Sequence, residues 1–182
     1  MRGVIEALDL DQLRHQFEVN VFGTIAVAKA VLPGMRRRRS GHIVNIVSQG
    51  GIVTFPGLGA YHGSKFALLG MSDALAKEVR HLGIRVSAIL PGLYRSDWSG
   101  RSQAHSANHI ADYDAALGQN KDLQWGNPAA LGRVVVETIE MDNPPEHLLV
   151  GPSALHNVRE QMQNWLAEID RWESLSWAGG EG

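Results

Sequence analysis

Hydrophobic positions recur every three or four residues near the start of the chain and predict a long amphipathic helix. The apolar residues of this repeat are Leu13, Phe17, Val21, Ile25, Ala28 and Leu32. Asp9 is suited to cap the helix, and Gln12 stands at its third position, as in a capping box. We expect the helix to run to about Arg38, with Pro33 kinking its last turn.

Two short apolar stretches rich in β-branched residues, at 42–48 and 84–90, predict buried strands. Between them, residues 60–82 have the period of a second helix, and Gly83 is placed to end it. The side of this helix that packs inward is expected to carry Leu68, Leu69, Met71, Leu75 and Val79.

The C-terminal half predicts a long excursion, a helix, a strand and a last helix. Residues 94–127 are polar, with scattered aromatics and no strong period, which is typical of a loop with short helices. Asn127-Pro128 predicts a helix start, residues 147–150 a third strand, and residues 153–172 the last helix. Strands separated by helices imply right-handed crossovers. The predicted fold class is therefore α/β, with about three parallel strands and flanking helices.

The composition is that of an ordinary globular protein and excludes some kinds of site. With 182 residues, 44% hydrophobic residues and a net charge of −2, the chain can form one domain with a core. The absence of cysteine excludes disulfides and thiolate metal sites. The basic run at residues 36–39 is placed to complement the end of a helix. The near-zero net charge gives no support for nucleic-acid binding.

From the length of its apolar runs, we expect the protein to be cytoplasmic and to have no membrane partner. None of them approaches the roughly 20 residues of a membrane span. Residues 1–9 lack the basic and apolar blocks of a signal peptide.

Tyr61 and Lys65 are the first candidates for chemistry, because a spacing of four places them on one face of a helix. A nearby cation favours a phenolate and lowers the pKa of the phenol from its usual value of about 10. Ser48 stands at the end of the first predicted strand, where ligands bind in parallel α/β sheets, and its hydroxyl can hold a polarised oxygen. Taken alone, the Tyr-x-x-x-Lys pair also fits an incidental tyrosine beside a solvated lysine.

Four motifs stand in order along the chain: Asn20-Val21-Phe22-Gly23, Asn45-Ile46-Val47-Ser48, Tyr61-His62-Gly63-Ser64-Lys65 and Pro91-Gly92. In this order and spacing, the chain resembles the short-chain dehydrogenase/reductase family over essentially its whole length. The resemblance implies an NAD(P)-dependent oxidoreductase that transfers a hydride between a nicotinamide and a carbonyl or alcohol substrate.

The resemblance also implies a role for each catalytic residue. Tyr61 would be the general acid/base, and Lys65 would lower its pKa and bind the ribose hydroxyls of the cofactor. Ser48 would hydrogen-bond the substrate oxygen and stabilise developing charge. Asn20 would hold a water that links Lys65 to solvent.

On the cofactor side, the resemblance implies that Pro91, Gly92 and Leu93 line the nicotinamide site, together with Tyr61 and Lys65. Ser96 stands where most members have threonine and keeps a hydroxyl that can bind the cofactor carboxamide. The cofactor would be NAD or NADP, without a metal, and the substrate a small-molecule alcohol or ketone. Residues 94–124 would shape the substrate pocket.

Family members begin with a strand and a T-G-x-x-x-G-x-G turn that receives the cofactor pyrophosphate, followed by an N-N-A-G strand. This sequence contains none of these features. We therefore expect residues 1–182 to be a single, N-terminally truncated domain, with an incomplete Rossmann-like doubly wound sheet that lacks roughly 80 residues. Its first strand would be an exposed apolar edge, and the chain alone would bind NAD(P) poorly.

An alternative to an active enzyme is a catalytically inactive remnant that at most dimerises through its long helices, at residues 11–38 and 60–82. For the full domain, the family resemblance implies a homodimer or tetramer. A serine hydrolase fits badly, because Ser48 is not in a G-x-S-x-G turn.

Overall fold

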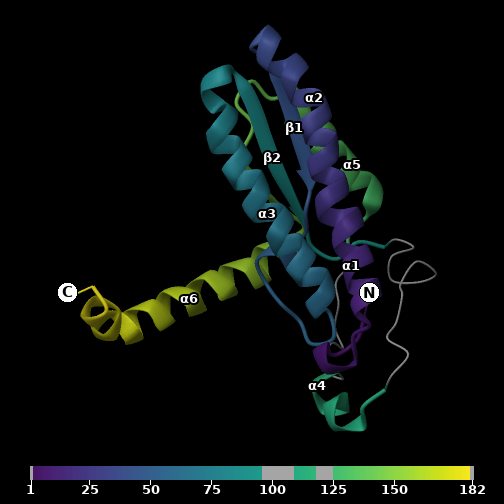
Figure 1. The fold of residues 1–182 in the computed structure, drawn as a ribbon, viewed down its shortest axis with the longest axis vertical. Coiled ribbons are helices and arrows are strands. Elements are labelled where there is room, and N and C mark those ends of the chain that lie inside the picture. The colour runs from purple at the N-terminus through teal and green to yellow at the C-terminus, as the bar shows by residue number, and fades with distance from the viewer. Residues whose placement is uncertain (1, 96–108, 118–124, 181–182) are drawn as a thin grey trace.

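The structure is a computed structural model that describes residues 2–95, 109–117 and 125–180 (Figure 1). One sheet contains the parallel strands β1 (Gly41–Ile46), β2 (Ile84–Pro91) and β3 (His147–Val150), in the order β1-β2-β3. The expected α/β class, with three parallel strands and flanking helices, is confirmed.

The first helical segment runs from Leu10 to Arg38 and has three parts: α1 (Leu10–Phe17), the π-helical η2 (Glu18–Gly23) and α2 (Thr24–Arg38). The expected helix is confirmed, and α2 continues past Pro33 to its basic end. The π-helical part was not anticipated. Such turns insert an extra residue into a helix and are frequent at functional sites.

The start of this segment forms as the sequence predicts. The carboxylate of Asp9 accepts hydrogen bonds from the backbone N–H groups of Asp11 and Gln12, at 2.8 and 3.0 Å. By length and composition alone, residues Leu10–Arg38 could cross a membrane, which inspection of the apolar runs did not anticipate. A core helix of a globular protein passes the same test when it is mostly buried; here the 18-residue apolar window is 11% buried, and Val21 and Ala28 are buried residues of the segment.

The second long helix, α3 (Gly59–Val79), continues as a short 3-10 turn and ends at Gly83, whose φ of 71° is left-handed. Its buried positions include Leu68, Ser72, Ala76 and Val79. The expectation that Met71 is buried is wrong: its side chain is 39% exposed. Ser72 takes the inward position instead, because its hydroxyl accepts a hydrogen bond from the Asn45 amide at 2.8 Å and donates one to Leu68 O at 2.7 Å.

The hydrophobic core lies between α3 and β2. Ile89 and Leu90 of β2 are fully buried, as expected for the middle strand of a parallel sheet. Among the described residues, β1 pairs only with β2, so its outer edge is open. Ile46 at the end of this edge is 46% exposed, in agreement with the predicted apolar edge.

The C-terminal elements are α5 (Pro128–Glu140) and α6 (Pro152–Ala178). Asn127 caps α5, as predicted, by accepting from the N–H of Ala129 at 2.9 Å. The expected end of the last helix near residue 172 is wrong, because no helix-breaking residue follows until Gly179. In the described part of the preceding excursion, residues 111–113 and α4 (Asp114–Leu117) form the expected short helices.

Candidate active site

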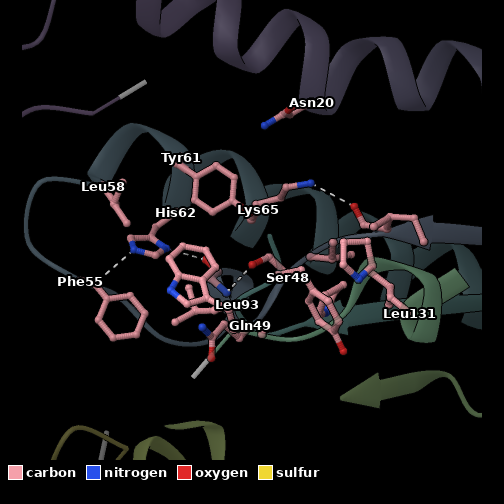
Figure 2. Close-up of a pocket in the computed structure, with 18 of the residues that line it drawn as sticks. Asn20, Ser48, Gln49, Phe55, Leu58, Tyr61, His62, Lys65, Leu93 and Leu131 are labelled. Carbon is pink, nitrogen blue, oxygen red and sulfur yellow. Dashed lines mark hydrogen bonds between the residues drawn. The ribbon is translucent and has the colours of Figure 1, made fainter. Parts of the chain in front are cut away.

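A cavity of about 430 Å³ lies at the carboxyl ends of β1 and β2 (Figure 2). The structure brings most of the sequence-predicted site residues together around it: Asn20, Ser48, Tyr61, Lys65, Pro91, Gly92 and Leu93. Ser96 lies outside the described residues. These residues come from η2, α3 and the ends of two strands, and they line one cavity. Their chemical roles stay predictions.

Ser48 lies two residues beyond the end of β1 and begins the 3-10 turn Gln49–Gly51. Its hydroxyl oxygen accepts a hydrogen bond from the N–H of Gly50 at 3.0 Å and also hydrogen-bonds to the Tyr61 phenol. Gly50 is required here, because a Cβ atom would lie 2.7 Å from Nδ1 of His62. The turn therefore aims Ser48 at Tyr61 through a glycine that lets two elements approach closely.

Burial raises the pKa of the Tyr61 phenol above its ordinary value, and the hydrogen bond from Ser48 opposes that rise only in part. The net shift of the Tyr61 pKa in the structure is therefore upward, and the expected lowering of this pKa by Lys65 stays a prediction. Lys65 Nζ lies 6.0 Å from the centre of the Tyr61 ring and donates a hydrogen bond to Ile46 O at 3.0 Å. Desolvation outweighs the cation at this separation.

Lys65 itself is desolvated by the cavity wall. Burial lowers the pKa of its ammonium to about 8. The group therefore stays mostly protonated at neutral pH and is in reach of losing its proton at mildly basic pH.

Asn20 is placed by the π-helical part of the first segment. Its amide donates to the Ser64 hydroxyl at 3.0 Å, and that hydroxyl donates to Tyr61 O at 2.8 Å. Asn20 is thus held against the same turn of α3 that carries Tyr61. Its expected role in holding a water for Lys65 stays a prediction. Together with Ile46 and Lys65, Asn20 also lines a second cavity, of about 550 Å³, between α2 and β1.

His62 is a site residue that sequence reasoning missed. Its ring is 3% exposed; Nε2 accepts from the N–H of Phe55 at 2.9 Å, and Nδ1 lies 3.0 Å from Gly50 O. Because a backbone N–H can only donate, Nε2 carries no proton and Nδ1 donates to Gly50. Burial lowers the pKa of this imidazole. Neutral His62 therefore ties the loop after Ser48 to the first turn of α3 (Figure 2).

Ser153, at the start of α6, was also missed. Its hydroxyl accepts from the N–H of Leu93 at 3.0 Å, and a Cβ atom on Gly92 would overlap this hydroxyl. Gly92 therefore lets the end of β2 pack directly on α6. In the sequence, this contact is indicated by Gly92 alone. Ser153, the residue that Gly92 packs against, lies 61 positions later in the chain.

Aromatic and aliphatic side chains form the remaining wall of the cavity. Tyr94 and Arg95 belong to the segment that was expected to shape a substrate pocket. Phe55, Trp125 and Leu131 also line the cavity and lie outside that segment. The cavity thus combines one polar corner, around Ser48, Tyr61 and Lys65, with a largely apolar mouth.

Comparison with known sequences identifies relatives along most of the chain. The family model for short chain dehydrogenases matches residues 1–107. Oxidoreductase BOA17 of Botryotinia fuckeliana is 33% identical over 181 residues, which are 96% of this chain and 66% of that protein. A 3-ketodihydrosphingosine reductase of Bacteroides thetaiotaomicron is 34% identical over 157 residues, which are 82% of this chain and 58% of that protein.

Solved structures of short-chain dehydrogenases are also similar to this chain. A short-chain dehydrogenase from Streptomyces avermitilis superposes with a TM-score of 0.89 at 32% identity, covering 98% of this chain and 66% of the other. A short chain dehydrogenase from Burkholderia cenocepacia in complex with NADP has the same fold, with a TM-score of 0.72 at 23% identity, and the match covers 94% of this chain and 63% of the other. The chain thus spans about two thirds of the length of these relatives or less. On the family match and these likenesses, the chain belongs to the short chain dehydrogenase family.

Proposed function

We propose that this chain carries the catalytic apparatus of an NAD(P)-dependent oxidoreductase, which exchanges a hydride between a nicotinamide and the carbon of a carbonyl or alcohol. The observation that carries the proposal is that Ser48, Tyr61 and Lys65, from a strand end and a helix, line one cavity; the Ser48 hydroxyl also acts on the pKa of the Tyr61 phenol. Two hydroxyl groups aimed at one point can hold the oxygen of a carbonyl from two directions.

The cavity suits part of a nicotinamide cofactor. Its volume of about 430 Å³ is within the roughly 300–1,000 Å³ of small-molecule sites. The Lys65 ammonium has three donors, of which Ile46 O accepts one, so it can also bind sugar hydroxyls. Pro91, Gly92 and Leu93 would form the wall behind the ring. The Burkholderia relative of the same fold was solved with NADP, which supports a nicotinamide cofactor; the bound cofactor would supply or accept the hydride.

In the proposed reaction, Ser48 and Tyr61 orient the substrate oxygen and polarise its carbonyl. The Tyr61 phenol gives its proton to that oxygen as the alcohol forms, and the reverse direction returns the proton to Tyr61. Lys65 stabilises the phenolate left on Tyr61, because an ammonium close to a phenolate lowers its energy. The apolar mouth around Phe55 and Trp125 would exclude water and favour an apolar alcohol or ketone.

The test measures the oxidation of NADH and NADPH by a panel of aldehydes and ketones, at cofactor concentrations that compensate for weak binding. The Tyr61→Phe variant should lose about 100-fold or more of the wild-type rate, the usual contribution of general acid/base catalysis. Tyr113→Phe is the matched control, because Tyr113 is exposed and bonds to Glu6 rather than lining the cavity.

Unchanged activity in Tyr61→Phe would contradict the role of Tyr61. No turnover by the wild-type chain with any substrate would contradict the proposed function and leave the inactive remnant. A fluorescence titration in parallel tests the expected poor cofactor binding, which micromolar affinity would contradict.

A further inference from the structure

The far part of α6 is an exposed apolar helix. Every residue from 162 to 178 is exposed, and Figure 1 shows α6 leaving the body of the protein at an angle. Among the described residues, the beginning of the helix is held by the buried Ala154 and Val158, by the hydrogen bond from Leu93 N–H to Ser153 and by one from the Asn157 amide to Gln49 at 3.1 Å. The exposed apolar side chains of α6 are Leu155, Met162, Trp165, Leu166, Ile169, Trp172, Leu175 and Trp177, at 37–71% exposure.

These side chains follow the spacing of a coiled coil. The exposed Met162, Trp165, Ile169 and Trp172 are separated alternately by three and four residues and continue the spacing of Leu155 and Val158, of which Val158 is buried against the protein body. That alternation is the seven-residue repeat by which two helices bury a common seam. A contiguous apolar stripe of this length on a soluble protein marks an interaction site.

Charges beside the seam select the orientation of a second helix. In an antiparallel pair that sets Met162 opposite Trp172 of the second copy, Arg159 lies beside Glu173 of the second copy. By two-fold symmetry this attraction occurs twice. It is opposed by a single repulsion, between Glu168 and Glu168 of the second copy near the two-fold axis. A parallel pair would instead set Glu168 beside Glu173 twice, with no attraction to offset the repulsion.

The net charge of α6 argues against an anionic membrane as the occupant. The helix carries Arg159 and Arg171 against four acidic residues, Glu160, Glu168, Asp170 and Glu173. Helices that lie on membranes are instead rich in Lys and Arg on their polar face.

We propose that α6 pairs with α6 of a second copy of this chain, as an antiparallel two-helix coiled coil centred near Leu166. This interface is separate from the long helices Leu10–Arg38 and α3, and it does not depend on the proposed enzymatic function. It buries two tryptophans of each copy at the seam.

Light scattering coupled to gel filtration tests the pairing. The wild-type chain should be a dimer at micromolar concentrations, and Ile169→Asp should raise the dissociation constant about tenfold or more, since it removes a central apolar contact. Arg159→Glu should also weaken the dimer, and the double variant Arg159→Glu/Glu173→Arg should restore it. Circular dichroism checks that each variant is folded.

Several outcomes would overturn the proposal. They are a monomeric wild type, a dimer that survives Ile169→Asp, and a double variant that is no better than Arg159→Glu. Co-sedimentation of a monomeric chain with anionic lipid vesicles would assign the stripe to a membrane instead.

Cysteine crosslinking tests the orientation, because the chain has no cysteine of its own. Leu166→Cys should form a disulfide-linked dimer when treated with diamide, since residue 166 lies near the two-fold axis. Leu155→Cys should not, because its copies would be about 35 Å apart along the pair at 1.5 Å per residue. Equal crosslinking of the two variants would contradict the antiparallel pair.

Discussion

Tyr61 is held in its protonated form by the cavity around it. Burial raises the pKa of the phenol, and the ammonium of Lys65, which lines the same cavity, is directed at a backbone carbonyl. In the proposed function this arrangement favours the donation of a proton, and hence carbonyl reduction. Alcohol oxidation requires a phenolate, for which Lys65 must come closer to the phenol oxygen.

His62 should make the stability of the fold depend on pH. Its folded-state pKa lies below the unfolded value of about 6.5. As the pH falls below about 6.5, the unfolded chain therefore binds a proton that the folded chain excludes. Stability is retained above that pH and lost below it, with a slope of at most about 1.4 kcal/mol per pH unit for one such group.

The His62→Gln variant tests this dependence, because glutamine can still donate to Gly50 O and accept from Phe55 N–H. We expect urea unfolding to show a shallower loss of stability in acid for this variant than for the wild type. His81→Gln, at an exposed position, is the control and should keep the wild-type slope. Identical slopes for all three proteins would contradict the role given to His62.

At the scale of elements, the end of β2 and the start of α6 depend on a close approach between Gly92 and Ser153. Gly92→Ala should lower the free energy of unfolding by about 1–3 kcal/mol, because its methyl group overlaps the Ser153 hydroxyl. In the Ser153→Ala background the same substitution should cost less, since the hydroxyl is gone. Urea denaturation of the two single variants and the double variant measures this coupling, and strictly additive losses would count against it.

Local signals account for the elements that the sequence predicted well. The caps Asp9 and Asn127 and the terminator Gly83 act on backbone groups within a few residues, so their effect is visible in a short window. The exposure of Met71 and the π-helical turn at Asn20 depend on contacts with other elements. No periodicity within one helix contains that information.

In the candidate site too, residues that form a local motif were predicted, and residues that act between distant segments were not. Ser48, Tyr61 and Lys65 were found because their spacing forms a motif, and the structure brings them to one cavity. His62 and Ser153 were missed because each acts on backbone groups of a different segment. The net upward shift of the Tyr61 pKa was not anticipated, because burial depends on the whole cavity wall.

At the scale of the whole molecule, the open edge of β1 and the adjoining face of α2 form a second apolar surface. Val19 of η2 and Val27 and Val31 of α2 are 39–65% exposed and line the cavity of about 550 Å³. An open apolar sheet edge is a site of aggregation. Val27→Lys should therefore slow aggregation on heating, with a change in stability within about 0.5 kcal/mol, as is usual for surface substitutions.

Val136→Lys is the matched control, because Val136 is 54% exposed on α5, outside this surface. Turbidity at constant temperature compares the two variants with the wild type. Equal protection by both substitutions would show that general charge, rather than this surface, governs aggregation.

The first turns of α6 contact the active-site cavity at two places, through Ser153 at Leu93 and through Asn157 at Gln49. The helix then runs, without a break, to its exposed end. If a ligand shifted the wall at Leu93, the contact with Ser153 would carry that shift to the start of α6, and a small rotation there would be a large displacement at its far end. By thermodynamic linkage, whatever binds that far end and changes the affinity of the cavity must have its own affinity changed by the same factor. Ligand binding in the cavity and assembly through α6 would then be reciprocal effectors of each other.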